Sequence, residues 1–264
     1  MFHQDAVRYH YSTPQLREVI CQVRFPAILS IGTTEPAEFQ EAIRAEFPRY
    51  AVKQDQPAPK ITVSGGEVKV EKPQPVTNYH FLSADNRWKL NLTRDFISLS
   101  TVAYDGWEDF GRRLDLPLAQ FIRIYQPAFF QRIGLRYLNI FSRKALGLEG
   151  EPWRELFTSP YLGLLNFEDA AEERTVKSIV EYDTALDSSC RVKVHAGPGM
   201  IRNNAPNAPA DNEPRFILDL DLYMAGETAP ALAAGALETL HSHSTDLFQG
   251  AITRKLHHAM GPSF

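Results

Sequence analysis

The sequence has only two cysteines in 264 residues, no long hydrophobic run and no excess of basic residues. Cys21 and Cys190 are too few for a disulfide framework or for a zinc site made of cysteine alone. No apolar stretch approaches the ~20 residues that a membrane-spanning helix needs. The first eight residues lack a basic segment followed by an apolar one, so we expect no secretory signal. These absences predict a cytoplasmic protein with no membrane partner.

A surplus of charge of one sign is also missing. Lysine and arginine total 28 against 32 aspartate and glutamate, a formal net charge of −4. A protein whose main partner is nucleic acid normally carries a basic surplus, because it neutralises phosphates. The balance therefore disfavours nucleic acid as the main partner, although it is compatible with a local basic face. Hydrophobic residues make up 44% of the chain, which excludes a disordered protein and predicts an ordinary buried core.

Hydrophobic spacing predicts alternating strands and helices in the first half of the chain. Residues 18–25 are rich in β-branched side chains and end before Pro26, which predicts a strand. A helix is expected after Thr34, because Phe39, Ile43 and Phe47 follow at helical spacing. The remaining elements are a hairpin over 61–70, strands at 79–83, 88–92 and 96–101, and an amphipathic helix over 107–125.

The turn at Arg94 and Asp95 predicts the register of the hairpin around it. Apolar side chains then face one another across the two strands on one side of the sheet, as cross-strand packing requires. The expected pairs are Leu92 with Ile97, Leu90 with Leu99, and Trp88 with Thr101.

The second half of the chain repeats this order of elements. We expect a strand at 132–141, a helix over 152–165, strands at 176–184, 190–196 and 216–223, and one long helix from Pro230 to Gly261. Each half thus contains a strand, a helix, three or four strands and a helix. The sequence predicts an α+β fold with antiparallel sheets backed by helices, formed by an internal duplication into closely packed units 1–128 and 129–264. This order resembles the TATA-binding-protein and helix-grip topology, which by itself implies no function.

Asp219 and Asp221 are the most specific candidates for a metal-binding or catalytic site. They lie on one face of a predicted strand, about 7 Å apart, and paired carboxylates can bind a divalent cation or share acid and base roles. The preceding strand places Arg191 and Lys193 on one face, together with His195. We expect Lys193 to face Asp219 and Arg191 to face Asp221. Opposite charges across a ladder explain these residues without a metal, so we favour that interpretation.

Other polar residues give weaker signals. His241, His243, His257 and His258 lie on the last predicted helix, but neither pair has the spacing of three or four residues that a helical metal site needs. We expect His241 to be partly buried and hydrogen-bonded, and His257 and His258 to be solvated. The loop 201–214 is either functional or simply disordered.

Three arginines raise the possibility of an anion site. Arg132 and Arg136 share a face of one predicted strand, and Arg24 is available on the first strand. They could bind phosphate, but scattered surface arginines are the commoner explanation.

Several short motifs are spread over nearly the whole chain. They are Pro14-x-Leu16-x-Glu18-Val19, Tyr104-x-x-Trp107-x-x-Phe110, Gly134-Leu-Arg-Tyr-x-Asn139, Leu218-Asp-Leu-Asp221, and Leu240-His241 with Phe248 and Ile252-Thr253. Together they resemble a sporadically distributed family of uncharacterised bacterial proteins of about this length. The family has no assigned activity, so the resemblance implies a single conserved architecture, a bacterial source and membership of an accessory or defence gene set.

The sequence contains no Ser-His-acid order, no Cys-His pairing and no phosphate-binding Gly-rich motif with its Lys-Ser/Thr pair. We therefore predict no catalytic residue, no cofactor and no resident metal. The leading hypothesis is a non-enzymatic cytoplasmic binding protein with an unknown protein partner. The alternatives are a nucleic-acid-binding component that uses a basic sheet face, and a metal-dependent hydrolase that uses Asp219 and Asp221.

Overall fold

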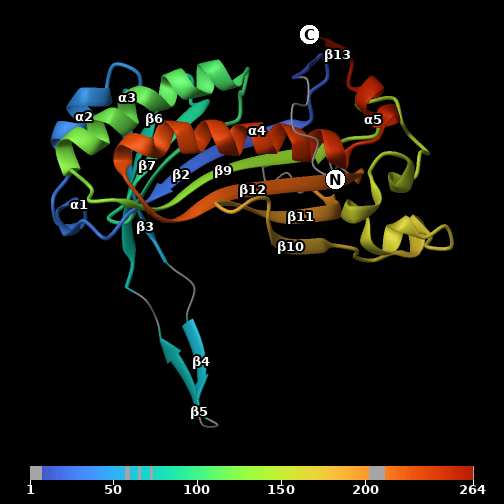
Figure 1. Cartoon of the computed structure of the whole chain (residues 1–264), viewed down its shortest axis with the longest axis horizontal. Coiled ribbons are helices and arrows are strands. Elements are labelled where there is room, and N and C mark those ends of the chain that lie inside the picture. Colours follow the sequence, from blue (N-terminus) through green and yellow to red (C-terminus); the bar gives the residue numbers. More distant parts are fainter. Residues whose placement is uncertain (1–7, 57–59, 65–66, 72–73, 202–211, 264) are drawn as a thin grey trace. The chain divides into compact units, whose positions relative to one another are not determined.

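The computed structural model describes residues 8–56, 60–64, 67–71, 74–201 and 212–263, and its fold is α+β, as predicted. Nine strands form one sheet in the order β10-β11-β12-β9-β2-β8-β7-β6-β3 (Figure 1). Their bounds are β2 Leu16–Arg24, β3 Arg49–Asp55, β6 Val76–Leu82, β7 Trp88–Leu92, β8 Phe96–Thr101, β9 Phe130–Phe141, β10 Val180–Ala185, β11 Cys190–Met200 and β12 Pro214–Thr228.

Two small antiparallel sheets complete the strand inventory of the described residues. One pairs β4 (Lys60–Ser64) with β5 (Glu67–Glu71), the hairpin expected over 61–70, whose turn residues lie outside the described part. The other pairs β1 (His10–Tyr11) with β13 (Pro262–Ser263), so that His10 lies opposite Ser263. The α-helices are α1 Leu29–Thr33, α2 Ala37–Ile43, α3 Trp107–Tyr125, α4 Ala233–Ala251 and α5 Arg254–Ala259.

The chain divides into two compact units that are not simple halves of the sequence. Unit 1 comprises residues 1–19, 134–225 and 234–264, and unit 2 comprises residues 20–133 and 226–233. Each unit thus combines segments that are distant in sequence. The internal duplication proposed from the order of elements stays a prediction.

Unit 2 confirms the predicted hairpin in full. Its strands β7 and β8 pair Trp88 with Thr101, Leu90 with Leu99, and Leu92 with Ile97. Leu90, Leu92 and Leu99 are completely buried, because one face of this hairpin is apolar throughout. The predicted amphipathic helix is α3, which runs without interruption through Pro117.

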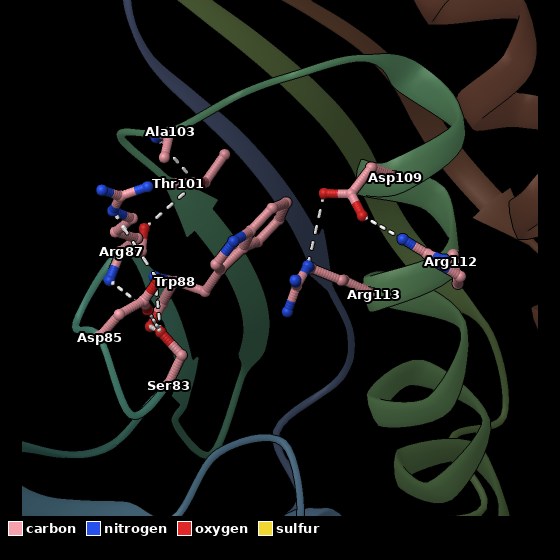
Figure 2. Close-up of polar contacts among 9 residues, drawn as sticks. All are labelled: Ser83, Asp85, Arg87, Trp88, Thr101, Ala103, Asp109, Arg112 and Arg113. Carbon is pink, nitrogen blue, oxygen red and sulfur yellow. Dashed lines mark hydrogen bonds and ion pairs between the residues drawn. The ribbon is translucent and has the colours of Figure 1, made fainter.

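The turn between β6 and β7 is held by Asp85 (Figure 2). Its carboxylate accepts hydrogen bonds from Ser83 Oγ at 2.6 Å and from the Arg87 amide at 3.1 Å. On the other side of Trp88, the Arg113 guanidinium of α3 lies 4.8 Å from the centre of the indole ring. Arg113 is itself fixed by Asp109, one turn earlier on α3. A cation–π contact therefore connects the start of β7 to α3.

Unit 1 contains α4, whose Leu237, Leu240 and Leu247 are buried. The prediction of a single helix from Pro230 to Gly261 was wrong, because α4 ends at Ala251 and α5 begins at Arg254. Thr253 lies at the break and caps α5 by accepting a hydrogen bond from the Leu256 amide at 3.4 Å. A threonine hydroxyl in this position favours a new helix start over continuation of the old helix.

The prediction of a helix over 152–165 was also wrong. This segment forms the three 3₁₀ turns η1 (Trp153–Glu155), η2 (Ser159–Tyr161) and η3 (Gly163–Asn166). Pro160 and the positive φ of Gly163 (54°) are incompatible with a continuous α-helix. Phe157 instead stacks on Phe216 of β12 with the ring centres 3.8 Å apart, which anchors the segment to the sheet.

None of the helices in the described ranges has the combined length and apolarity that crossing a lipid bilayer requires.

Candidate functional site

A groove with a volume of about 1220 Å³ lies in the described part of unit 1. Part of its lining comes from residues 153–174, the segment of 3₁₀ turns that Figure 1 draws in yellow. Its walls are formed by the loop after β9, by η1, by residues 168–176 with η4 (Glu172–Arg174), and by the adjoining ends of β11 and β12. Loops and strand ends, rather than the sheet face, therefore shape this surface.

Arg143 and Glu172 hold one wall of the groove in place. The Arg143 guanidinium donates to Glu172 Oε2 at 3.0 Å and to the Glu151 carbonyl oxygen at 2.7 Å, and it lies 4.1 Å from the centre of the Trp153 indole. Glu172 also accepts a hydrogen bond from the Trp153 amide. Both charged side chains are mostly buried, with 17% and 22% exposed. This ion pair therefore stabilises the wall of the groove, and both of its side chains are already occupied by contacts within the protein.

Glu213 also stabilises the loop after β9 that lines the groove. Its carboxylate accepts hydrogen bonds from Ser142 Oγ at 2.8 Å and from the Lys144 amide at 3.0 Å. Arg215 adds an ion pair at 3.4 Å. The carboxylate thus connects the loop after β9 to the start of β12.

Large apolar side chains are exposed along the groove. Val176 and Met200 line it, with 102% and 51% of their surface accessible. Of the ten exposed large hydrophobic side chains among the described residues, four lie in the sixteen-residue stretch 164–179. They are Leu164, Phe167, Val176 and Ile179. A concentration of this kind, next to polar side chains, is typical of an interaction surface.

The charge of the groove is mixed. Six acidic and four basic side chains line it. Two of the acidic groups, Glu172 and Glu213, are already paired with arginine. The groove therefore lacks the basic surplus that a phosphate backbone would need.

The structure corrects the predicted pairing of Asp219 and Asp221. In the ladder between β11 and β12, Lys193 lies opposite Asp221 and His195 lies opposite Asp219, two residues away from the predicted register. A slip of two residues keeps every side chain on its face of the sheet, so the apolar pattern cannot detect it. Asp219 instead binds Arg136 of β9 through two hydrogen bonds of 2.7 and 2.5 Å.

Arg191 and Lys193 of β11 form ion pairs with carboxylates of β10, and Arg191 also donates a hydrogen bond to Tyr223 of β12 at 3.2 Å. Lys193 lies 2.8 Å from Glu181, and Arg191 lies 2.9 Å from Asp183. Tyr223 of β12 donates a hydrogen bond to Asp183 at 2.8 Å.

These contacts move the pKa values of the groups in the directions expected for charge pairs. The hydrogen bond from Lys193 lowers the pKa of Glu181, and the hydrogen bond from Tyr223, followed by Arg191, lowers that of Asp183. The hydrogen bond to Asp219 raises the pKa of Arg136. The ladder of opposite charges favoured from sequence is therefore present, with different partners.

The three arginines considered for an anion site make different contacts. Arg136 is committed to Asp219, as described above. Arg24 lies 3.9 Å from Asp95 at an exposed position. Arg132 is partly buried on β9, where its charge acts on the thiol of Cys21. Two of the three guanidinium groups thus already face a carboxylate.

The histidines of the last helical segment differ from one another. His241 is buried with 7% exposed, and its Nδ1 lies 2.8 Å from the Tyr137 hydroxyl, as expected. His258 is exposed, as expected. The prediction for His257 was wrong, because this side chain is partly buried with Nδ1 3.0 Å from the Tyr11 hydroxyl, and burial lowers its pKa.

Sequence reasoning missed one cluster of side chains. Asp187, Cys190 and His243 place a carboxylate oxygen, a thiol sulfur and a ring nitrogen within 4.8 Å of one another. The sequence has no motif that pairs this cysteine with a histidine, because His243 is 53 residues beyond Cys190 and only the fold brings them together. The spacing Asp187-x-x-Cys190, which places two types of metal ligand on either side of a tight turn, is the one local feature that points to the cluster.

Both cysteines are buried free thiols. Burial raises the pKa of Cys190 to about 11 and that of Cys21 to about 12. A thiol with so high a pKa is a poor nucleophile near neutral pH, so neither is suited to covalent catalysis. No known protein-family model matches this chain, and neither a curated protein nor a solved structure gives a significant match.

Proposed function

We propose that this protein is a non-enzymatic binding protein that holds a protein partner against the groove of unit 1. The observation that carries the proposal is the concentration of exposed apolar side chains along residues 164–179 and at Met200, beside the groove. Burying such side chains against a partner is favourable by roughly 25 cal/mol per Å² of apolar surface. The mixed charges around them supply the polar rim that protein interfaces have.

The two alternative functions have less support. A nucleic-acid partner needs unengaged positive charge, but the groove has more acidic than basic side chains, and Arg136 and Arg24 face carboxylates. A hydrolase that uses Asp219 and Asp221 needs both carboxylates for a metal, but Asp219 is held at both oxygens by Arg136. Protein binding makes use of the exposed apolar surface, which neither alternative explains.

The proposal also includes a cytoplasmic location and a role in a bacterial accessory or defence gene set. These parts rest on the sequence and on the family resemblance alone. They define the cells in which the partner should be sought.

Site-specific photo-crosslinking in the native host tests the proposal. A photoreactive amino acid is placed at Val176 or Met200, and in a matched control at Val102, which is 52% exposed in unit 2. We expect one protein to crosslink at the two groove positions and not at Val102. The crosslinked protein is then identified by mass spectrometry, purified and titrated against the unmodified chain.

Variants separate binding at the groove from non-specific adhesion. The double variant Val176→Asp and Met200→Asp should weaken partner binding at least tenfold, whereas Val102→Asp should bind like wild type. Both variants should melt like wild type, because the replaced side chains are exposed. Equal binding by the groove variant, or equal crosslinking at all three positions, contradicts the proposal. Salt-sensitive binding of nucleic acid in its place would favour the first alternative.

A further inference from the structure

The hairpin loop between β10 and β11 presents two potential metal ligands to a third on α4. Asp187 lies in the loop, Cys190 is the first residue of β11, and His243 is on α4. The three residues offer a carboxylate oxygen, a thiol sulfur and an imidazole nitrogen, and they are not among the residues that line the groove. These are the three ligand types found in protein zinc sites.

Hydrogen bonds within the loop orient the Asp187 carboxylate. Asp187 Oδ1 accepts hydrogen bonds from the amides of Ser189 and Cys190, both at 2.7 Å, and from Ser189 Oγ at 3.0 Å. This leaves Oδ2 directed at His243, whose Nε2 lies 2.9 Å away. These hydrogen bonds therefore hold the carboxylate in one orientation, with Oδ2 toward His243.

The distances fit a tetrahedral ion with small shifts. Bonds of about 2.0–2.3 Å to Zn²⁺ place tetrahedral ligand atoms roughly 3.4–3.6 Å apart. The ligand atoms here lie within 4.8 Å of one another, so side-chain shifts of about 1 Å bring all three to a common ion. Access is open from the solvent side, because the Asp187 and His243 side chains are 38% and 20% exposed, while Cys190 closes the inner side.

We propose that Asp187, Cys190 and His243 bind one Zn²⁺ ion, which ties the β10–β11 loop to α4. Binding replaces the hydrogen bond between His243 and Asp187 with two bonds to the metal. The Cys190 thiol loses its proton to solvent, and His243 binds through unprotonated Nε2 with its ring proton on Nδ1. The fourth position of a tetrahedral ion is left for water or for a group from a partner.

Titration of chelator-treated protein with Co²⁺ tests this site, because Co²⁺ bound to thiolate has a strong near-ultraviolet absorption band that Co²⁺ on nitrogen and oxygen lacks. We expect one equivalent of Co²⁺ to produce the band and Zn²⁺ to abolish it by displacement. Affinity should increase with pH, since the thiol must release a proton. Zn²⁺ should also raise the melting temperature, by mass action on the folded state.

Variants identify the ligands. Cys190→Ala should abolish the thiolate band, and His243→Gln should weaken Co²⁺ binding at least tenfold. His258→Gln, a change at an exposed histidine outside the cluster, should bind Co²⁺ like wild type. Cys190 is buried, so if its variant does not fold, the His243 variant decides the question. Absence of a thiolate band in wild type, or a band that His243→Gln leaves unchanged, overturns the proposal.

Discussion

The hydroxyl of Tyr137 on β9 lies 2.8 Å from Nδ1 of His241 on α4. Only 8% and 7% of these two residues are exposed, so the hydrogen bond is shielded from water. It joins β9 of unit 1 to α4, the longest helix of that unit. A buried hydrogen bond of this kind is costly to break, because the remaining polar atom cannot turn to solvent.

Tyr137→Phe should therefore lower the free energy of unfolding by about 1–3 kcal/mol. Urea denaturation followed by circular dichroism measures the change. The matched control is Tyr223→Phe, which removes an exposed hydroxyl bonded to Asp183 and should cost less than about 1 kcal/mol. Equal losses in the two variants would contradict a specific role for the buried hydrogen bond.

Leu90 is completely buried on β7 opposite Leu99. Leu90→Ala should cost about 2–5 kcal/mol, and Leu90→Asp should prevent folding, since it places a charge in the core. Thermal melting and the yield of soluble protein measure these effects. Lys89→Ala, one residue away on the other face of the strand, should change stability by no more than about 0.5 kcal/mol. A Leu90→Asp variant that melts like wild type would refute the register.

The ion pair between Arg136 and Asp219 provides a test of the corrected ladder. A double-mutant cycle with Arg136→Gln and Asp219→Asn should give a coupling energy of roughly 0.2–1 kcal/mol, since Arg136 is 44% exposed and solvent weakens the interaction. The cycle of Lys193→Gln with Asp219→Asn should give a coupling near zero, because Lys193 lies opposite Asp221. The reverse result would restore the register that the sequence predicted.

His80 on β6 should make the stability of unit 2 depend on pH. Burial lowers its pKa from the ordinary value of 6.5, and the nearby charges of Lys89 and Lys53 lower it further, while Asp55 opposes them. As the pH falls below about 6.5, the unfolded chain takes up a proton that the folded chain resists, so stability decreases. His80→Gln should reduce the loss of stability between pH 7 and pH 5.

Equilibrium denaturation at several pH values measures the contribution of His80. Identical pH profiles for wild type and His80→Gln would show that the protonated form is tolerated in the folded state.

Gly197 on β11 has φ of 151°, and a Cβ atom there would lie 2.2 Å from the Ser178 carbonyl oxygen. Gly197→Ala should therefore destabilise the protein by at least about 2 kcal/mol, because the backbone of residues 178–179 must move. Gly199→Ala is the control, since its Cβ would meet only the flexible end of Ile217 at 3.1 Å. Similar melting temperatures for the two variants would count against the close approach at Gly197.

The elements that could be predicted from sequence are those whose signal is local. In the β7–β8 hairpin, a two-residue polar turn and strict alternation determine the register, and each predicted pair is present. The β11–β12 hairpin has a long loop, and its alternation is equally compatible with a slip of two residues. Which carboxylate meets Lys193 could therefore not be decided from the pattern.

The candidate sites depend on contacts between distant segments, which a single sequence does not encode locally. The 3₁₀ turns at 153–166 have the apolar spacing of a helix, but Phe157 packs on Phe216 and Pro160 breaks the hydrogen-bond pattern. Val176 and Met200 line the same groove although they come from different segments of the chain. His243 approaches Cys190 only because α4 passes the β10–β11 loop.

The pairing of β1 with β13 affects the order in which the protein can fold during synthesis. His10 and Ser263 are 253 residues apart in the chain. At ~5–20 residues per second, a ribosome needs at least roughly ten seconds to make the intervening segment. For that time β1 is outside the ribosome without its strand partner. This small sheet therefore closes after most of the chain has been synthesised, and it can lock the fold of unit 1 only as a late step.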